Sequence, residues 1–323
     1  MKKRTFMSWL TAASVGGIAP GAFAADESWP SRPIRILTPV PPGGTSDILA
    51  REFGQRLSER VGQPVIVENR PGANGVIATV AVARAPADGY TLLMTLTQHV
   101  QVPTQFKDVG YDPVEDFTPI GRIGAAATVL AATPRLGVKS AKELAEVAAG
   151  KNLTFGTTAT GPQVIIEVFN KSANLGMLNV PYKGESAALT DLIGGQIDMA
   201  LLTVATARGY IESGKLTPLA VIAPARAPAL PDVPTFLEQG FKEVNWTGGW
   251  YGFLAPANVP PQIASRLVTE FKGIFDDPAV QTKLKGLNIN LDWIGGEPFK
   301  QAMKRDMEIW STLVKRSGVV IER

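Results

Sequence analysis

Positions 43–47 hold two glycines and three polar residues in a pattern that could bind an anion: Gly43, Gly44, Thr45, Ser46 and Asp47. An apolar run precedes them, and a pattern with apolar residues at every fourth position follows, which predicts a strand, a turn and a helix. Glycine lets the backbone approach a ligand closely, and the first N–H groups of a helix lack partners, so a carboxylate or a phosphate could bind there. The same residues also fit an ordinary turn in which Ser46 or Asp47 caps the helix.

Two further predicted strands, at 90–95 and 152–156, also end in turns that carry polar residues. The candidate ligand-binding residues in these turns are Thr97, Gln98, His99, Thr158, Thr160, Gly161 and Gln163. Gly156 and Gly161 have the spacing of a P-loop, but Pro162 and Gln163 stand where that motif needs Lys and Ser or Thr. A nucleotide site is therefore not predicted. His99 lies at a strand end, where it could donate to a ligand or simply pack in a loop.

Two more candidates lie in later predicted strands. Tyr182 ends the strand predicted at 177–182, on the same edge of the sheet as the turn at 157–163. Asp198 lies inside the apolar run 196–202, where an unpaired charge is costly, so it either has a structural partner or faces a ligand. Trp250 and Tyr251 could form a wall of a cleft or pack in the core.

Catalytic chemistry finds little support in the residue types. The chain has no cysteine and one histidine, which excludes a thiol nucleophile and a multi-histidine metal site. The segment 184–188 resembles a nucleophile elbow only loosely, because its last glycine is missing, and no residue positions His99 as a base. We therefore expect no enzyme activity, no cofactor and no bound metal.

Composition sets the broad class. With 323 residues, 45% hydrophobic and 19% charged, the chain is long enough for two globular units. Residues 1–24 have a basic start, an apolar stretch and a small-residue cleavage site, which predicts a secretory signal peptide and a mature chain that is soluble and exported. Its removal takes three positive charges from a formal net charge of +3, leaving zero. With no basic block interleaved with aromatic residues, we expect no nucleic-acid partner.

Strands that alternate with helices predict an α/β protein with mostly parallel sheets. Extended segments near 118–129 and 246–255 could cross between two units. This predicts one lobe formed by 25–124 and 247–323 and a second lobe formed by 125–246. In such sheets ligands bind beyond the carboxyl ends of the strands, where the polar turns lie.

Short motifs spread through the mature chain resemble the periplasmic solute-binding receptors of tripartite tricarboxylate transporters, also called the Bug family. The matching segments are 41–47, 50–51, 67–73, 111–117, 180–184, 192–198, 230–235, 250–252 and 255–256. The order of these segments is that of the family.

The resemblance implies a two-lobed periplasmic binding protein of the type II-like class, each lobe a mainly parallel sheet flanked by helices. It implies capture of a small organic carboxylate and delivery to membrane permease subunits. The family's carboxylate loops correspond here to 43–47, 97–99 and 157–163, and Asp198 corresponds to an acid that often contacts the far end of the ligand. We expect a monomer. An alternative role, a sensor component that presents the ligand to a membrane signalling partner, remains open.

Overall fold

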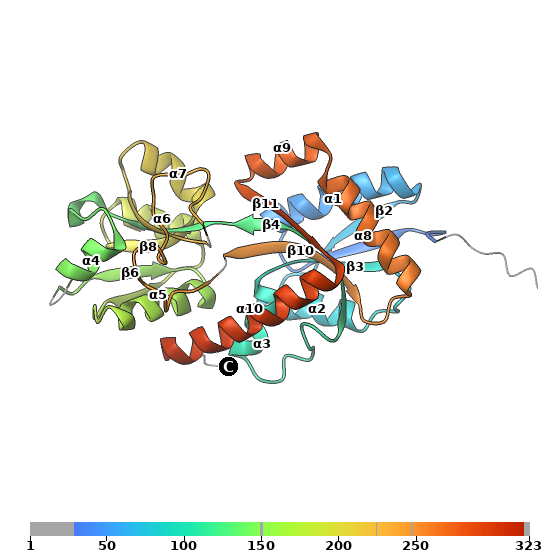
Figure 1. The fold of residues 1–323 in the computed structure, drawn as a ribbon, viewed down its shortest axis with the longest axis horizontal. Helices are drawn as coiled ribbons and strands as arrows, with labels where there is room; N and C mark the ends of the chain where they lie inside the picture. The colour runs from blue at the N-terminus through green and yellow to red at the C-terminus, as the bar shows by residue number, and fades with distance from the viewer. Residues whose placement is uncertain (1–28, 149–150, 224, 247, 320–323) are drawn as a thin grey trace, which may run out of the picture.

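The computed structural model describes residues 29–148, 151–223, 225–246 and 248–319, and it has two lobes side by side (Figure 1). The predicted signal peptide, 1–24, lies outside the described residues. The first part of the chain forms β1 (Ile34–Thr38), α1 (Thr45–Val61), β2 (Val65–Asn69), α2 (Val76–Ala83), β3 (Thr91–Leu96), α3 (Gln98–Gln105) and β4 (Phe117–Ala126). The middle part forms β5 (Thr128–Ala132), α4 (Ala141–Val147), β6 (Thr154–Thr157), α5 (Thr160–Ser172), β7 (Leu178–Pro181), α6 (Glu185–Ile193), β8 (Met199–Thr203), α7 (Val204–Glu212) and β9 (Thr217–Ile222). The last part forms β10 (Gly249–Pro256), α8 (Pro261–Phe275), α9 (Pro278–Gly286), β11 (Ile289–Gly295) and α10 (Gly296–Ser317).

Each lobe is built on one sheet. The sheet of lobe 1 has the strand order β11-β4-β10-β3-β1-β2, and the sheet of lobe 2 has the order β7-β6-β8-β5-β9. The predicted α/β class and two-lobed architecture are confirmed, and both sheets are mixed rather than mainly parallel. The strands β1, β2 and β3 run parallel, as do β6, β7 and β8, whereas β4, β10 and β11 in lobe 1 and β5 and β9 in lobe 2 pair antiparallel.

Helices cover both faces of each sheet, and the apolar residues of each helix point at it. In lobe 1 one core layer joins α1 and α8 to the sheet through Phe53, Phe253 and Phe271, whose rings lie 4.6 to 5.9 Å apart. The other layer joins α2, α3 and α10 to the sheet around Trp250. Lobe 2 repeats this plan with α4 and α5 on one face and α6 and α7 on the other.

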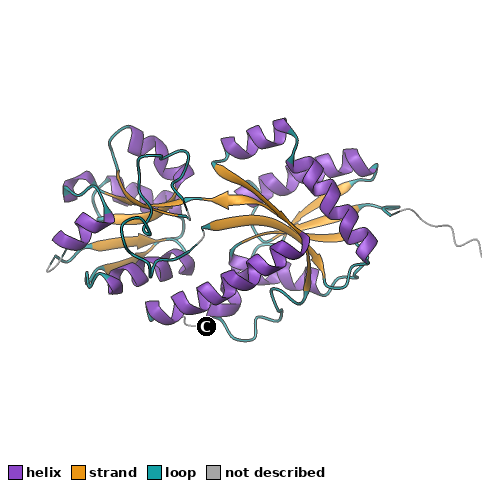
Figure 2. Ribbon diagram, viewed as in Figure 1, coloured by secondary structure: helices purple, strands orange, loops and turns teal. Residues whose placement is uncertain are grey.

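Two extended segments join the lobes, as Figure 2 shows for the long strands that run between them. The β4 strand belongs to the first sheet and β5, which begins after Ala127, belongs to the second. The return crossing leads from lobe 2 into β10.

The helix α10 departs from the predicted lobe division, which assigned all of 247–323 to lobe 1. Its first half packs Phe299 and Met303 against lobe 1, but its second half places Trp310 and Leu313 in the core of lobe 2. The ring of Trp310 lies 5.2 Å from that of Trp246 and is completely buried. The helix therefore contacts both lobes. No helix within the described ranges is long and apolar enough to cross a membrane.

Candidate functional site

A cavity of about 330 Å³ lies between the lobes. Parallel strands β3 in lobe 1 and β6 in lobe 2 both end at it, which is where ligands bind in sheets of this kind. The residues that line it are Asn74, Leu96, Thr97, Gln98, Gln101, Gln105, Ala126, Thr158, Ala159, Thr160, Gly161, Pro162, Trp246, Gly249, Trp250 and Tyr251. None of these lining residues carries a charge.

The lobe 1 wall is the start of α3. The buried Thr97 is fixed to β10 twice, because its N–H donates to the Trp250 carbonyl at 3.0 Å and its hydroxyl accepts from the Trp250 N–H at 2.5 Å. The first residues of α3 follow directly, so their N–H groups point along the helix axis with no carbonyl of a preceding turn to bind. Gln98 and Gln101 add side-chain amides to this wall.

The lobe 2 wall is the start of α5. Ala159 precedes the helix in an extended conformation, and no side chain caps it. The Thr158 and Thr160 hydroxyls and the unpaired N–H groups of the first turn are therefore donors at the cavity. Gly161 meets the other lobe here: a side chain at this position would place its Cβ 3.1 Å from the Gln101 amide oxygen. The two helix starts thus face each other across a narrow gap.

The loop 43–47 lies beside this cavity rather than in its lining. Its helix begins at Thr45 with Gly44 as the capping residue, so the interpretation of Ser46 or Asp47 as the N-cap was wrong. Thr45 is hydrogen bonded to the side chain of Tyr251, a residue of the cavity wall. The loop is therefore connected to the cavity through Tyr251.

Asp47 organises that loop from the buried side. Its carboxylate accepts from the Gly43 N–H at 2.9 Å and from the Asn69 amide at 2.8 Å, and it forms an ion pair with Arg51 at 2.9 Å. Burial acts to raise the pKa of Asp47, but the bonds from Arg51, Gly43 and Asn69 outweigh it, and the pKa is lowered. Asn69 also donates to the Val40 carbonyl at 3.1 Å, so both sides of the turn are held.

His99 points away from the cavity. Its ring is buried, bonds through Nε2 to the Pro113 carbonyl at 2.8 Å and stacks on Tyr111 at 5.4 Å. Burial lowers the pKa of His99 to about 4, so the ring is neutral at ordinary pH. Of the two alternatives from the sequence, the structure has the packed side chain, and only the backbone of His99 belongs to the start of α3.

Asp198 also lies elsewhere. It comes immediately before β8, at the end of the sheet opposite the cavity. Its carboxylate pairs with Arg135 at 3.0 Å and accepts from the Thr154 N–H at 2.8 Å and hydroxyl at 3.0 Å. Of the two alternatives from the sequence, the structural partner is the one present, because all these bonds tie strand ends of lobe 2 together.

Two other candidates are not in the lining. The Tyr182 hydroxyl donates to Asp191 at 2.7 Å, and burial and that carboxylate raise the pKa of Tyr182 to about 12. Gln163 lies in α5, beyond the residues that reach the cavity. Four further residues line the cavity but were not predicted from the sequence as ligand-binding: Asn74, Gln101, Gln105 and Trp246. A signal for Asn74 was the glycine-flanked turn 72–75, where it has φ of 53°.

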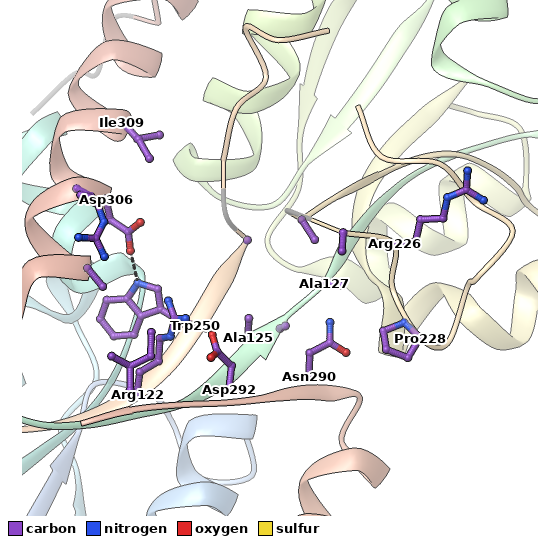
Figure 3. Close-up of a pocket in the computed structure, with 17 residues that line it drawn as sticks. Arg122, Ala125, Ala127, Arg226, Pro228, Trp250, Asn290, Asp292, Asp306 and Ile309 are labelled. Atoms are coloured by element: carbon purple, nitrogen blue, oxygen red, sulfur yellow. Dashed lines mark hydrogen bonds and ion pairs between the residues drawn. The ribbon is translucent and has the colours of Figure 1, made fainter. Parts of the chain in front are cut away.

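A second cavity, of about 540 Å³, lies beside the crossing strands between α10, β11 and the residues Ala223, Ala225, Arg226 and Pro228 (Figure 3). Several of its charged groups bind one another or nearby side chains. Arg122 pairs with Asp292, the Trp250 ring N–H donates to Asp306 at 2.8 Å, and Arg226 pairs with Glu238 at 3.0 Å. Among the described residues that line this cavity, none lies at the end of a parallel strand, so we expect the ligand in the smaller cavity.

Comparison with known proteins identifies the family of the chain. Residues 49–323 match the family described as the tripartite tricarboxylate transporter family receptor. The chain belongs to this family.

Its relatives are solute-binding receptors and not enzymes. The protein BugT of Bordetella pertussis (strain Tohama I) is 33% identical over 256 residues, covering 77% of this chain and 78% of BugT. A solved R. palustris protein with adipate is 30% identical, with a TM-score of 0.74 over 90% of this chain and 99% of that chain. MatC from Rhodopseudomonas palustris with bound malate is 27% identical, with a TM-score of 0.71 over 88% of this chain and 100% of that chain.

Proposed function

We propose that the protein captures a small organic carboxylate between its lobes in the periplasm and delivers it to the membrane subunits of a tripartite tricarboxylate-type transporter. Membership of the receptor family and the two neighbours solved with adipate and malate support this function. The observation that carries it is the interlobe cavity, where two helix N-termini from different lobes meet beyond the carboxyl ends of β3 and β6.

The cavity favours an anion without using a cation. Backbone N–H groups at the starts of α3 and α5 carry the positive ends of their helix dipoles, and anions are stabilised there. The Thr158 and Thr160 hydroxyls and the Gln98 and Gln101 amides can donate as well. Such donors bind a carboxylate when closure removes water from around it.

The loop 43–47 completes the site in this proposal. Gly43 and Gly44 are exposed, and the N–H groups of Thr45 and Ser46 stand at the first turn of α1. This turn and α3 belong to the same lobe, so closure would bring the start of α5 toward both of them, and three helix starts would share the carboxylate.

The test is calorimetry on protein freed of bound ligand by unfolding and refolding, against a panel of mono-, di- and tricarboxylates. We expect binding with a dissociation constant of about a micromolar or tighter for at least one member. The matched pair of variants is Thr160→Val, which removes a hydroxyl from the lining, and Thr190→Val, which removes one from the exposed face of α6. The first should weaken binding and the second should not; a refolded parent that binds no carboxylate contradicts the function.

Export and oligomeric state belong to the same proposal. Removal of 1–24 predicts a mature chain that begins at Ala25, which the mass of protein recovered from a periplasmic extract measures directly. We also propose a monomer, because the cavity is lined by both lobes of one chain and needs no second copy. Light scattering on the purified protein tests this point.

A further inference from the structure

Glu185 in lobe 2 is a carboxylate that is held by neutral donors. Glu185 is the first residue of α6, and it follows the turn after β7. One carboxylate oxygen accepts from the Thr203 N–H at 3.0 Å, and the other accepts from the Thr203 hydroxyl at 2.9 Å and the Thr206 hydroxyl at 2.6 Å. Within the described ranges, no ion pair involves Glu185. Its first oxygen accepts a single one of these bonds, so a lone pair stays open for another donor.

Glu185 lies on the cleft side of lobe 2. Thr203, which holds it, is the last residue of β8, and it pairs with Thr128 at the crossing between the lobes. The side chain of Glu185 is half-buried, so a ligand can still reach it.

Tyr251 of lobe 1 lies within electrostatic reach of Glu185. The pKa of Tyr251 is raised mainly by burial, opposed by the bond with Thr45, and raised further by the charge of Glu185. Tyr251 also lines the interlobe cavity, so Glu185 lies near a wall of the cleft that the starts of α3 and α5 share. The strand β8, whose last residue binds Glu185, is the parallel neighbour of β6, which leads into α5.

The cleft therefore has two unlike sets of groups. The helix N-termini and neutral donors suit a carboxylate, whereas Glu185 offers a fixed negative charge. A dicarboxylate would bring its second anionic group toward the charge of Glu185, and like charges repel each other in a partly desolvated site.

We propose that Glu185 binds the far end of the ligand and selects a carboxylate that ends in an ammonium group over one that ends in a second carboxylate. This rests on the proposed function, because the ligand's own carboxylate is taken to sit at α3 and α5. An ammonium group donates to the open lone pair and pairs with the charge, a hydroxyl can only donate, and a methyl group does neither.

The test compares carboxylates of one chain length that end in ammonium, hydroxyl, methyl or carboxylate, measured by calorimetry at two chain lengths. The parent should bind the ammonium-ended compound roughly tenfold tighter than the dicarboxylate, a difference of about 1.4 kcal/mol. Glu185→Gln keeps the shape and an acceptor oxygen but removes the charge, so it should lower the affinity for the ammonium compound and raise that for the dicarboxylate.

The matched control is Glu143→Gln. Glu143 is also an acid in the first turn of a lobe 2 helix and accepts from the Lys139 N–H at 2.7 Å, but α4 lies on the outer side of the lobe (Figure 1). It should leave the ranking unchanged. Preference of the parent for the dicarboxylate overturns the inference, as does an equal loss for every compound in a folded Glu185→Gln protein, which would show that Glu185 only ties α6 to α7. Absence of binding to any carboxylate contradicts the proposed function itself.

Discussion

The acids Asp47, Asp198 and Glu185 differ in the groups that bind their carboxylates. Asp47 is enclosed by donors and holds the turn that carries Thr45, while Asp198 is paired at the far end of the lobe 2 sheet. Glu185 alone among these three has no basic partner within the described ranges. An acid in a receptor of anions is therefore informative only once its partners are known.

Replacing Asp47 should loosen the loop before it affects any ligand directly. Asp47→Ala leaves the Gly43 N–H, the Asn69 amide and Arg51 without their acceptor, so we expect a loss of about 1–3 kcal/mol in the free energy of unfolding and weaker binding of every carboxylate. Because the folded pKa of Asp47 is lowered, this stability is present above its usual pKa and is lost as the pH falls through the lower folded value, below about pH 4. Urea unfolding across that range measures it.

Asp277→Ala is the matched control for that variant. Asp277 caps α9 in the same lobe by accepting from the Ala279 N–H at 2.8 Å, far in sequence from the cleft loops. Its loss should lower stability and leave affinity unchanged. Tight binding by a folded Asp47→Ala protein would remove the loop from the site.

His99 should set a pH dependence of folding and not of binding. Its pKa falls from 6.5 to about 4 on burial, so between these values the unfolded chain takes up a proton that the folded protein refuses. Stability present above pH 6.5 is thus lost as the pH falls toward 4, by about 3 kcal/mol.

The variant His99→Phe keeps a ring against Tyr111 and cannot titrate, so its unfolding free energy should lack this part of the slope. Affinity for the ligand should stay that of the parent, because the ring lies outside the cavity. A folded His99→Phe protein with tenfold weaker binding would restore a ligand role for the side chain.

At the scale of elements, the strand–turn–helix units could be predicted from the sequence, whereas α3 and β11 were not predicted. The units that begin α1 and α5 were visible because an apolar run, a glycine turn and a periodic helix follow in order. The helix α3 was missed because Pro103 lies inside it and polar residues dominate its first turn. The strand β11 was not predicted, although apolar Ile289, Leu291 and Trp293 alternate with polar residues in it. Its pairing with β4 has an irregular register.

Partners far apart in sequence explain the errors among site residues. Asp198 meets Arg135 across 63 positions, and Thr97 is fixed by Trp250 across 153. A single sequence carries no pairing information over such distances, so the direction in which a polar side chain points at a strand end could not be predicted.

The helix α10 is expected to couple the stability of the lobes. Trp310→Ala would leave a large void between α10 and α5 in the core of lobe 2, and we expect a loss of about 3–5 kcal/mol in urea unfolding. Hydrogen exchange should then increase in α5. Phe299→Ala, which empties a site on the lobe 1 half of the same helix, should instead increase exchange in β10 and α2. Equal changes in both lobes for both variants would contradict separate packing of the two halves.

At the scale of the whole molecule, the receptor function predicts closure of the lobes on a ligand. Because the chain lacks cysteine, two introduced cysteines would be the only sites labelled by thiol-reactive dyes. Dyes attached to cysteines at the exposed positions of Glu59 in α1 and Glu146 in α4 should move closer together when a carboxylate that the protein binds is added. A pair at Glu59 and Asp108, both exposed in lobe 1, should not respond. An unchanged distance for the first pair under saturating ligand would indicate a cleft that fills without closing.

The double packing of α10 limits how that closure can proceed. If the two strand crossings were the only connection, one lobe could both bend and twist relative to the other. The helix α10 adds a rigid connection beside them, because Phe299 packs in one lobe and Trp310 in the other. Twisting would pull Trp310 from its core, whereas rotation about an axis near α10 keeps both side chains packed. The lobes are therefore expected to close by one rotation, which brings the donors of α3 and α5 to the carboxylate in a fixed relative orientation.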